Sequence, residues 1–80
     1  MEDIGETVSV LASFGPSYKM QPVRFCWGGR TFAISEITYR WTSREGATVL
    51  HHFSVTDGST LFQLTFNTGS LLWSLDRVEA

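Results

Sequence analysis

The sequence predicts a small all-β domain with about six antiparallel strands, folded as a bent meander or a partly open SH3-like barrel. Apolar and polar residues alternate along much of the chain, and this alternation places the apolar side chains on one face of a strand. Turn-forming residues recur about every ten residues, a spacing that is typical of sandwiches and barrels. Because an open flat sheet would leave one aromatic face in water, we expect the sheet to curl.

A chain of 80 residues makes one domain. We expect residues 1–5 to be a flexible N-terminus and residues 6–80 to form a single β domain. A domain this small buries only about 60–65% of the surface that its unfolded chain exposes, so its core needs large side chains. The chain contains six Phe, three Trp and two Tyr. We expect the core to contain Phe25, Phe53, Phe62 and Trp73.

Six segments show the strand pattern: residues 7–14, 23–27, 31–41, 48–56, 60–66 and 71–78. In the third segment, the apolar residues change parity between Ile34 and Ile37. We therefore predict a β-bulge near Ser35–Glu36, because a bulge adds one residue and bends the strand. The alternative is a short helical turn over residues 35–39, with Ser35 as its cap.

The turns follow from short sequence signals. Gly28-Gly29 lies between two alternating segments and predicts a tight hairpin, because glycine readily adopts positive φ. Asp57-Gly58 and the segment 67–70 also predict turns. The polar segment 42–47 reads as a loop, and residues 18–22 are a connection without a clear pattern.

Charge and cysteine content narrow the possible environments. The net charge of −2 provides no general attraction to nucleic acid or to an anionic membrane. The single cysteine, Cys26, cannot form an internal disulfide. No apolar run approaches the roughly 20 residues of a membrane helix, and the acidic start does not match a signal peptide. We expect a cytoplasmic protein without a membrane partner, monomeric by default.

The sequence contains no catalytic, metal-binding or cofactor-binding signature. His51 and His52 are adjacent, so in a strand they point to opposite faces and cannot chelate one ion together. We expect His51 to be a hydrogen-bonded core residue and His52 to face solvent. Cys26 has no histidine next to it that would make it a nucleophile. The Gly28–Arg30 turn lacks the spacing of a phosphate-binding loop.

One set of basic and aromatic residues is a candidate binding surface. Arginines next to aromatic rings suit single-stranded nucleic acid, since the charges follow phosphates and the rings stack on bases. If the second and third strands pair, the arginines lie on one outer surface. The alternative is that the rings belong to the core and the arginines solvate its rim. The set comprises Arg24, Trp27, Arg30, Tyr39, Arg40, Trp41 and Arg44.

The segment Pro22-Val23-Arg24-Phe25-Cys26-Trp27-Gly28-Gly29-Arg30-Thr31-Phe32 resembles the opening motif of an uncharacterised bacterial family of small β domains. Later segments are similar to the rest of that pattern, and the likeness covers residues 20–78. These segments are Arg40-Trp41, Phe53-Ser54-Val55-Thr56-Asp57-Gly58, Phe62-Gln63-Leu64 and Trp73-Ser74-Leu75-Asp76-Arg77-Val78. Related segments are appended to ImuB-like DNA-repair polymerase homologues. The resemblance implies a DNA-associated or protein-docking role, and it assigns no catalytic residue.

Three classes of function follow from these observations. The first is a non-catalytic interaction module that docks on an unidentified protein. The alternative is an accessory nucleic-acid-binding module associated with DNA repair. The third is a barrel that binds or converts a small molecule, because barrel mouths can hold ligands.

Overall fold

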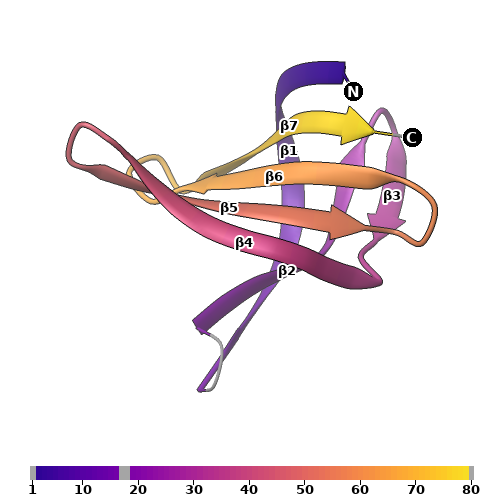
Figure 1. The fold of residues 1–80 in the computed structure, drawn as a ribbon, viewed down its shortest axis with the longest axis horizontal. Helices are drawn as coiled ribbons and strands as arrows, with labels where there is room; N and C mark the ends of the chain where they lie inside the picture. Colours follow the sequence, from indigo (N-terminus) through magenta and orange to yellow (C-terminus); the bar gives the residue numbers. More distant parts are fainter. Residues whose placement is uncertain (1, 17–18, 80) are drawn as a thin grey trace.

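The computed structural model describes residues 2–16 and 19–79, which form one bent antiparallel sheet of seven strands (Figure 1). The order in the sheet is β3-β2-β1-β7-β6-β5-β4, so β3 and β4 are the two edge strands. The all-β prediction is confirmed, and the sheet is not closed into a barrel. The strands are β1 (Glu2–Gly15), β2 (Lys19–Trp27), β3 (Arg30–Ala33), β4 (Glu36–Glu45), β5 (Thr48–Thr56), β6 (Leu61–Asn67) and β7 (Leu72–Glu79).

The predicted third strand is in fact two strands. At the break, the Ile34 N–H donates to the Val23 carbonyl (3.0 Å), whereas the Ser35 N–H donates to the Thr56 carbonyl (2.8 Å). Successive backbone groups thus bond to β2 and to β5, and the chain crosses from one edge of the sheet to the other. The predicted bend is at the right place, but the register shift lies between Ile37 and Tyr39. The alternative of a helical turn over residues 35–39 is wrong, because β4 begins at Glu36.

The predicted loop over residues 42–47 is also wrong. β4 continues to Glu45, and the register pairs Arg44 with Val49 and Glu45 with Thr48. Gly46 has a φ of 63° and is the first residue of a two-residue hairpin turn, where positive φ suits the twist of the strands. The sequence did not show this, because an edge strand with polar side chains has no apolar alternation to detect.

The predicted glycine hairpin between β2 and β3 is confirmed. Gly28 and Gly29 have φ values of 60° and 75°, and Trp27 pairs with Arg30. Positive φ at both central residues is the pattern of a type I′ turn.

The other two predicted turns are confirmed as well. The Asp57 N–H donates to the Thr60 carbonyl at 3.3 Å, and Gly58 has a φ of 106°. In the turn before β7, Asn67 Oδ1 accepts hydrogen bonds from the backbone of Gly69 and Ser70 at 2.8 and 3.0 Å. Asp and Asn side chains stabilise turns in this way because they replace a backbone acceptor.

β1 starts at Glu2 and not at the predicted residue 7. Its first residues pair with β7, where Asp3 lies opposite Arg77 and the two side chains form an ion pair at 3.1 Å. Gly5 has a φ of 69° and lies at the register shift between Asp3 and Glu6. Residues 2–5 therefore belong to the sheet.

The core occupies the concave side of the sheet, which we call the inner face. All four aromatic residues expected in the core are buried, and the Phe25 ring contacts the Phe62 ring with centroids 5.0 Å apart. β2 and β6 are not neighbours in the sheet, so this contact shows that the sheet folds over its own interior. The buried hydrophobic residues are Phe25, Phe53, Val55, Phe62, Leu64, Trp73 and Leu75.

Candidate binding site at the β4 edge

β4 is the longest edge strand of the sheet, and it pairs with β5 alone in the described part of the chain. Backbone N–H and C=O groups on its other side therefore have no strand partner. Such an unpaired edge is a template for pairing with another chain. We call this side of β4 the free edge.

The side chains of β4 alternate between the two faces of the sheet. Arg40 pairs with the buried Phe53, and Trp41 pairs with His52, so Arg40 lies on the inner face and Trp41 on the opposite, outer face. The same alternation places Arg40, Thr42 and Arg44 on the inner face, and Tyr39, Trp41 and Ser43 on the outer face.

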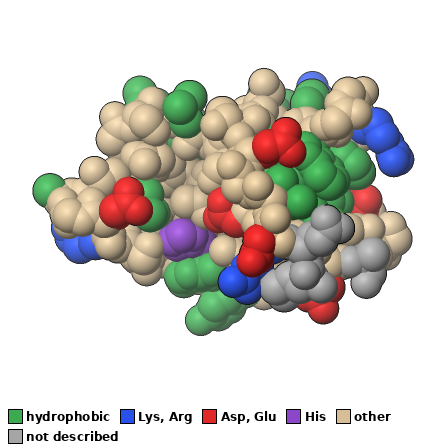
Figure 2. Space-filling view, turned by 90° about the horizontal axis from the view of Figure 1, so that it is seen from above, with side chains coloured by type: hydrophobic (Ala, Val, Ile, Leu, Met, Phe, Trp, Pro, Cys, Tyr) green, Lys and Arg blue, Asp and Glu red, His purple; other side chains and the backbone are tan. Residues whose placement is uncertain are grey.

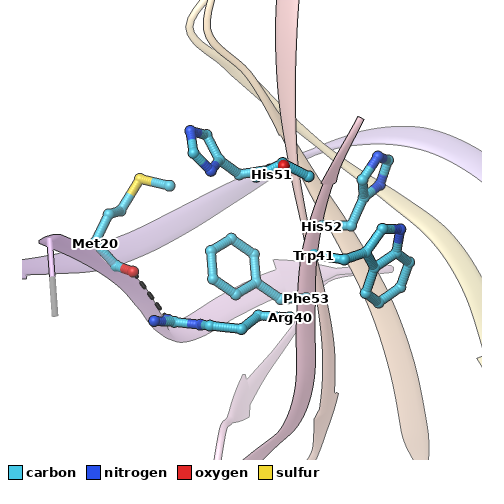
Figure 3. A pocket seen from close by; sticks show the side chains of 7 residues that line it. Met20, Arg40, Trp41, His51, His52 and Phe53 are labelled. Carbon is cyan, nitrogen blue, oxygen red and sulfur yellow. Dashed lines mark hydrogen bonds between the residues drawn. The ribbon is translucent and has the colours of Figure 1, made fainter. Parts of the chain in front are cut away.

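The inner face of β4 borders a pocket of about 420 Å³. Its wall on β2 is Met20, and the lining residues on β4 and β5 are Arg40, Trp41, Thr42, His51, His52 and Phe53. Figure 3 shows Arg40, His51 and Phe53 on the side of the strands that faces Met20, whereas Trp41 and His52 point to the other side. The pocket is therefore an apolar hollow with a guanidinium and an imidazole at its border.

Arg40 bridges this pocket. Its Nη2 donates to the Met20 carbonyl at 3.0 Å (Figure 3), and its guanidinium carbon lies 5.1 Å from the centre of the Phe53 ring. Both contacts are ones that a planar guanidinium makes well. They fix the position of the positive charge above the apolar wall.

A second hollow of about 250 Å³ lies next to the start of β4 and is lined by residues 21–23 and 34–37. Both hollows separate the first half of β2 from β4. We call this region the seam. Residues 19–22 of β2 pair with β1 alone, and the Arg40–Met20 hydrogen bond spans the seam.

The inner side of the free edge is positively charged. Arg40 and Arg44 lie two positions apart on this face, with Thr42 between them. Neither arginine forms an ion pair with another of the described residues. The ion pair seen there, Asp3–Arg77, joins β1 to β7, which are not neighbours of β4 in the sheet. An incoming carboxylate would find no competing acidic group on them.

Aromatic rings line the outer side of β4. The Tyr39 and Trp41 rings stack with centroids 5.3 Å apart and an angle of 29°. Trp41 also stacks on His52, at 5.1 Å and 13°. Tyr39 is 66% exposed, so the outermost ring of this stack is accessible to a ligand.

A chain of hydrogen bonds orients His52 across four strands. Ser43 Oγ lies 2.6 Å from His52 Nε2, and Thr65 Oγ1 lies 2.9 Å from His52 Nδ1. The Thr65 hydroxyl donates to Asp76 Oδ2, so it accepts from the Nδ1–H, and Nε2 in turn accepts from Ser43. Ser74 Oγ donates to the other Asp76 oxygen at 2.9 Å. We call this set the outer network.

In the outer network, the Ser43 hydroxyl is hydrogen-bonded to the His52 imidazole. In hydrolases, a hydrogen bond of this kind activates the serine as a nucleophile. Catalysis of that kind also needs a substrate cavity with groups that stabilise an oxyanion. His52 is among the residues that line the 420 Å³ pocket of the same strands, but its ring points away from Met20, to the outer side (Figure 3). We therefore interpret the outer network as the support of the Trp41–His52 stack.

The structure divides the seven residues of the predicted binding surface among several places. Arg24 is on the outer face of β2, and Tyr39 and Trp41 are on the outer face of β4. Trp27 and Arg30 lie near the β2–β3 turn, where Trp27 Nε1 donates to Glu6 Oε2 at 3.0 Å.

Arg30 lies over the Phe32 ring at 5.2 Å, while Arg40 and Arg44 line the inner face of β4. The expectation of one shared arginine surface is wrong, because Arg24 lies on the outer face of β2 whereas the register of β4 places Arg40 and Arg44 on the inner face. Sequence reasoning missed Met20 and Phe53 as pocket residues. Met20 lay in the segment without a pattern, and Phe53 was assigned to the core alone.

The two histidines point to opposite faces, as predicted. Their expected roles were different, however, since His52 on the outer face is the one held through both ring nitrogens. The described residues include no group of three His, Cys, Asp or Glu side chains placed to hold a metal ion. Cys26 is exposed, and its Sγ lies 3.4 Å from Thr31 Oγ1.

No protein-family model matches this chain, and no curated protein or solved structure matches it significantly. The described residues contain no helix with the length and apolarity needed to cross a membrane. On the face shown in Figure 2, hydrophobic side chains form separate groups among acidic, basic and uncharged ones. We therefore infer the function from the geometry of β4.

Proposed function

We propose that this chain is a non-catalytic interaction module that binds a segment of a partner protein at β4. The observation that carries this proposal is the combination of an unpaired strand edge with an apolar pocket on its inner side. A strand edge supplies backbone hydrogen bonds, and a pocket beside it selects side chains. The exposed Tyr39 adds an aromatic contact on the outer side.

The alternative is an accessory nucleic-acid-binding module, which the resemblance to DNA-repair-associated segments also implies. The accessible ring of Tyr39, stacked on Trp41, is a platform on which a base can stack. The nearest arginines, Arg40 and Arg44, lie on the other face of β4, and the net charge is −2. Rings and charges on different faces suit one strand of nucleic acid poorly, so we favour a protein segment.

The test is a selection from a displayed library of random 12-residue peptides against the whole chain. We expect the enriched peptides to lose about tenfold or more in affinity for Trp41→Ala, because a few large aromatic side chains carry most of the energy of a binding interface. Trp27→Ala is the matched control, since Trp27 is also half-buried but lies at the β2–β3 turn. Circular dichroism verifies that both variants fold.

Three results would contradict the proposal. The first is that the selection enriches no peptide. The second is that the two tryptophan variants weaken peptide binding equally. The third is that no peptide binds while labelled single-stranded DNA binds at about 50 mM salt and is released at high salt. The last result would favour the nucleic-acid alternative.

A further inference from the structure

We infer that the partner segment binds as an additional antiparallel strand on the free edge of β4, with two acidic side chains flanking an apolar one on the inner face. This inference rests on the proposed function and specifies the chemistry of its partner.

The backbone provides a regular template of suitable length. Beyond the register shift near Thr38, the pairing of β4 with β5 is continuous from Tyr39 to Glu45. A regular strand of this length presents alternate N–H and C=O groups at its free edge. An extended peptide of about seven residues pairs along the whole stretch, since strands gain about 3.4 Å per residue on both sides.

The inner side chains define three positions in the added strand. Residues that lie directly opposite each other in an antiparallel pair share a face, with Cβ atoms about 4.5–5.5 Å apart. The positions opposite Arg40 and Arg44 meet guanidinium groups that have no carboxylate partner among the described residues. The position opposite Thr42 lies next to the pocket, whose wall includes Met20 and Phe53. The partner residues that face the inner side are therefore acidic, apolar and acidic in turn, at every second position of the added strand.

The outer side chains define the two positions between these. They lie opposite Trp41 and Ser43, next to the stacked rings of the outer face. β-Branched or aromatic residues pair well with an aromatic residue across a sheet. Of the five central residues of the partner, the first, third and fifth face inward, and the second and fourth face outward. The first and fifth are glutamate or aspartate, the third is leucine, and the two outward residues are apolar.

A second copy of this chain does not fit the same edge. Two β4 strands that pair antiparallel would place Arg40 and Arg44 of both copies on one face. Glu36 and Glu45, the acidic residues of β4, pair with Thr56 and Thr48 and lie on the other face. Four arginines without a carboxylate repel each other, so the arginines oppose self-association and favour an acidic partner.

The experiment uses the whole chain and a fluorescein-labelled peptide of sequence TEVLVET, whose central pattern reads the same in both directions. A matched peptide, TKVLVKT, replaces both acidic residues with lysine. Two further peptides carry N-methyl groups, one on both valines and the other on the leucine and both glutamates. Successive N–H groups of a strand point to opposite sides. In a paired peptide, therefore, either the valine N–H groups or those of the leucine and the glutamates face β4, but not both.

We expect TEVLVET to bind at least about tenfold more tightly than TKVLVKT. Arg44→Ala weakens binding of TEVLVET about two- to fivefold, as for an exposed ion pair, whereas Arg24→Ala on the outer face of β2 changes it little. One N-methylated peptide loses binding and the other retains it. Amide hydrogen exchange slows at alternate residues of 39–45 when TEVLVET binds.

Several outcomes overturn strand addition. They are equal binding of TEVLVET and TKVLVKT, equal binding of the two N-methylated peptides, unchanged exchange over residues 39–45, or no binding of TEVLVET. If any of these occurs while library peptides still depend on Trp41, strand addition is wrong and the docking function stands. If the library peptides also fail, both are wrong.

Discussion

The two faces of the strands β4–β7 are stabilised by different interactions. On the inner face, Leu64 and Leu75 are fully buried among aromatic rings. On the outer face, the outer network runs from Ser43 on β4 to Asp76 on β7, and Thr65 in its middle is only 7% exposed. Leu64 and Thr65 are adjacent in β6, so neighbouring residues contribute to stability through apolar burial and through hydrogen bonding respectively. One sheet can thus order both of its faces without a second layer on the outer side.

This difference explains why the candidate site is at β4. The buried residues of the inner core reach as far as Phe53 and Val55 on β5. On β4, Ile37 still packs against this core, and the positions beyond the register shift add two arginines and a threonine to that face. The outer network likewise begins at β4, at its exposed Ser43. Both the apolar core of the inner face and the outer network end at β4, so side chains and backbone groups of this strand remain accessible to a partner.

The largest effect is expected on the inner face. Leu64→Ala should lower the free energy of unfolding by about 2–5 kcal/mol, the usual cost of a cavity in a packed core. Urea denaturation followed by tryptophan fluorescence measures this change. The matched variant Leu72→Ala, at a residue that is 54% exposed, should change stability by less than about 0.5 kcal/mol. Similar losses for both leucines would contradict the assignment of the core.

A smaller effect is expected on the outer face. Thr65→Val keeps the shape of the side chain but removes the hydroxyl that joins His52 to Asp76. The free energy of unfolding should fall by about 1–3 kcal/mol, because polar groups in a partly buried network lose their partner. Thr7→Val, at an exposed position of β1, is the control in the same denaturation experiment.

A double-mutant cycle decides whether these residues act as a network. The losses for Thr65→Val and His52→Ala should not add, because both substitutions break the same hydrogen-bond chain. Strict additivity would show that the outer network does not stabilise the fold cooperatively.

Arg40→Met examines the border between the two systems. Methionine keeps an apolar contact with Phe53 but cannot donate to the Met20 carbonyl. We expect a loss of about 1 kcal/mol or less, as for one exposed hydrogen bond together with a cation–π contact. Arg24→Met on β2 controls for the loss of charge. A loss of several kcal/mol would mean that the seam is part of the core.

The smallest effect lies outside both faces, in the turn between β5 and β6. Hydrogen bonds from the backbone N–H groups of Ser59 and then Thr60 lower the pKa of Asp57 below 3.8. A carboxylate with a lowered pKa stabilises the fold above its unfolded-state pKa, and this contribution is lost as the pH falls through its folded-state pKa.

Asp57→Asn should therefore reduce the dependence of the melting temperature on pH in the acidic range below 3.8, the ordinary pKa of this group. Asparagine preserves the turn, because its amide oxygen accepts the same hydrogen bonds but does not titrate in this range. Thermal unfolding followed by circular dichroism across this pH range is the measurement. An unchanged profile would show that other carboxylates account for the acid sensitivity.

Much of the fold was predictable from local patterns. The Gly28-Gly29 turn, the Asp57-Gly58 turn and the burial of Phe25, Phe53, Phe62 and Trp73 were all predicted from the sequence and are confirmed. The break at Ile34–Ser35 and the continuation of β4 to Glu45 were not. Both features depend on which strand accepts a backbone hydrogen bond, and side-chain alternation carries no information about that choice.

The candidate site was only partly predictable. The predicted binding surface included Tyr39, Arg40 and Trp41 from one predicted strand and Arg44 from a predicted loop, and their division between two faces depended on the register shift near Thr38. Met20 and His51 joined the pocket only because the sheet folds β2 toward β5.

The order of the residues alone determined that this chain forms short strands with one apolar face, because alternation and turn propensity act over only a few neighbouring residues. The tertiary structure alone decided that β4 is an edge, that its arginines face a pocket and that Ser43, His52, Thr65 and Asp76 form one network. These relations join residues that are 9 to 20 positions apart in the chain. They exist only after the sheet has bent and each strand has found its neighbours.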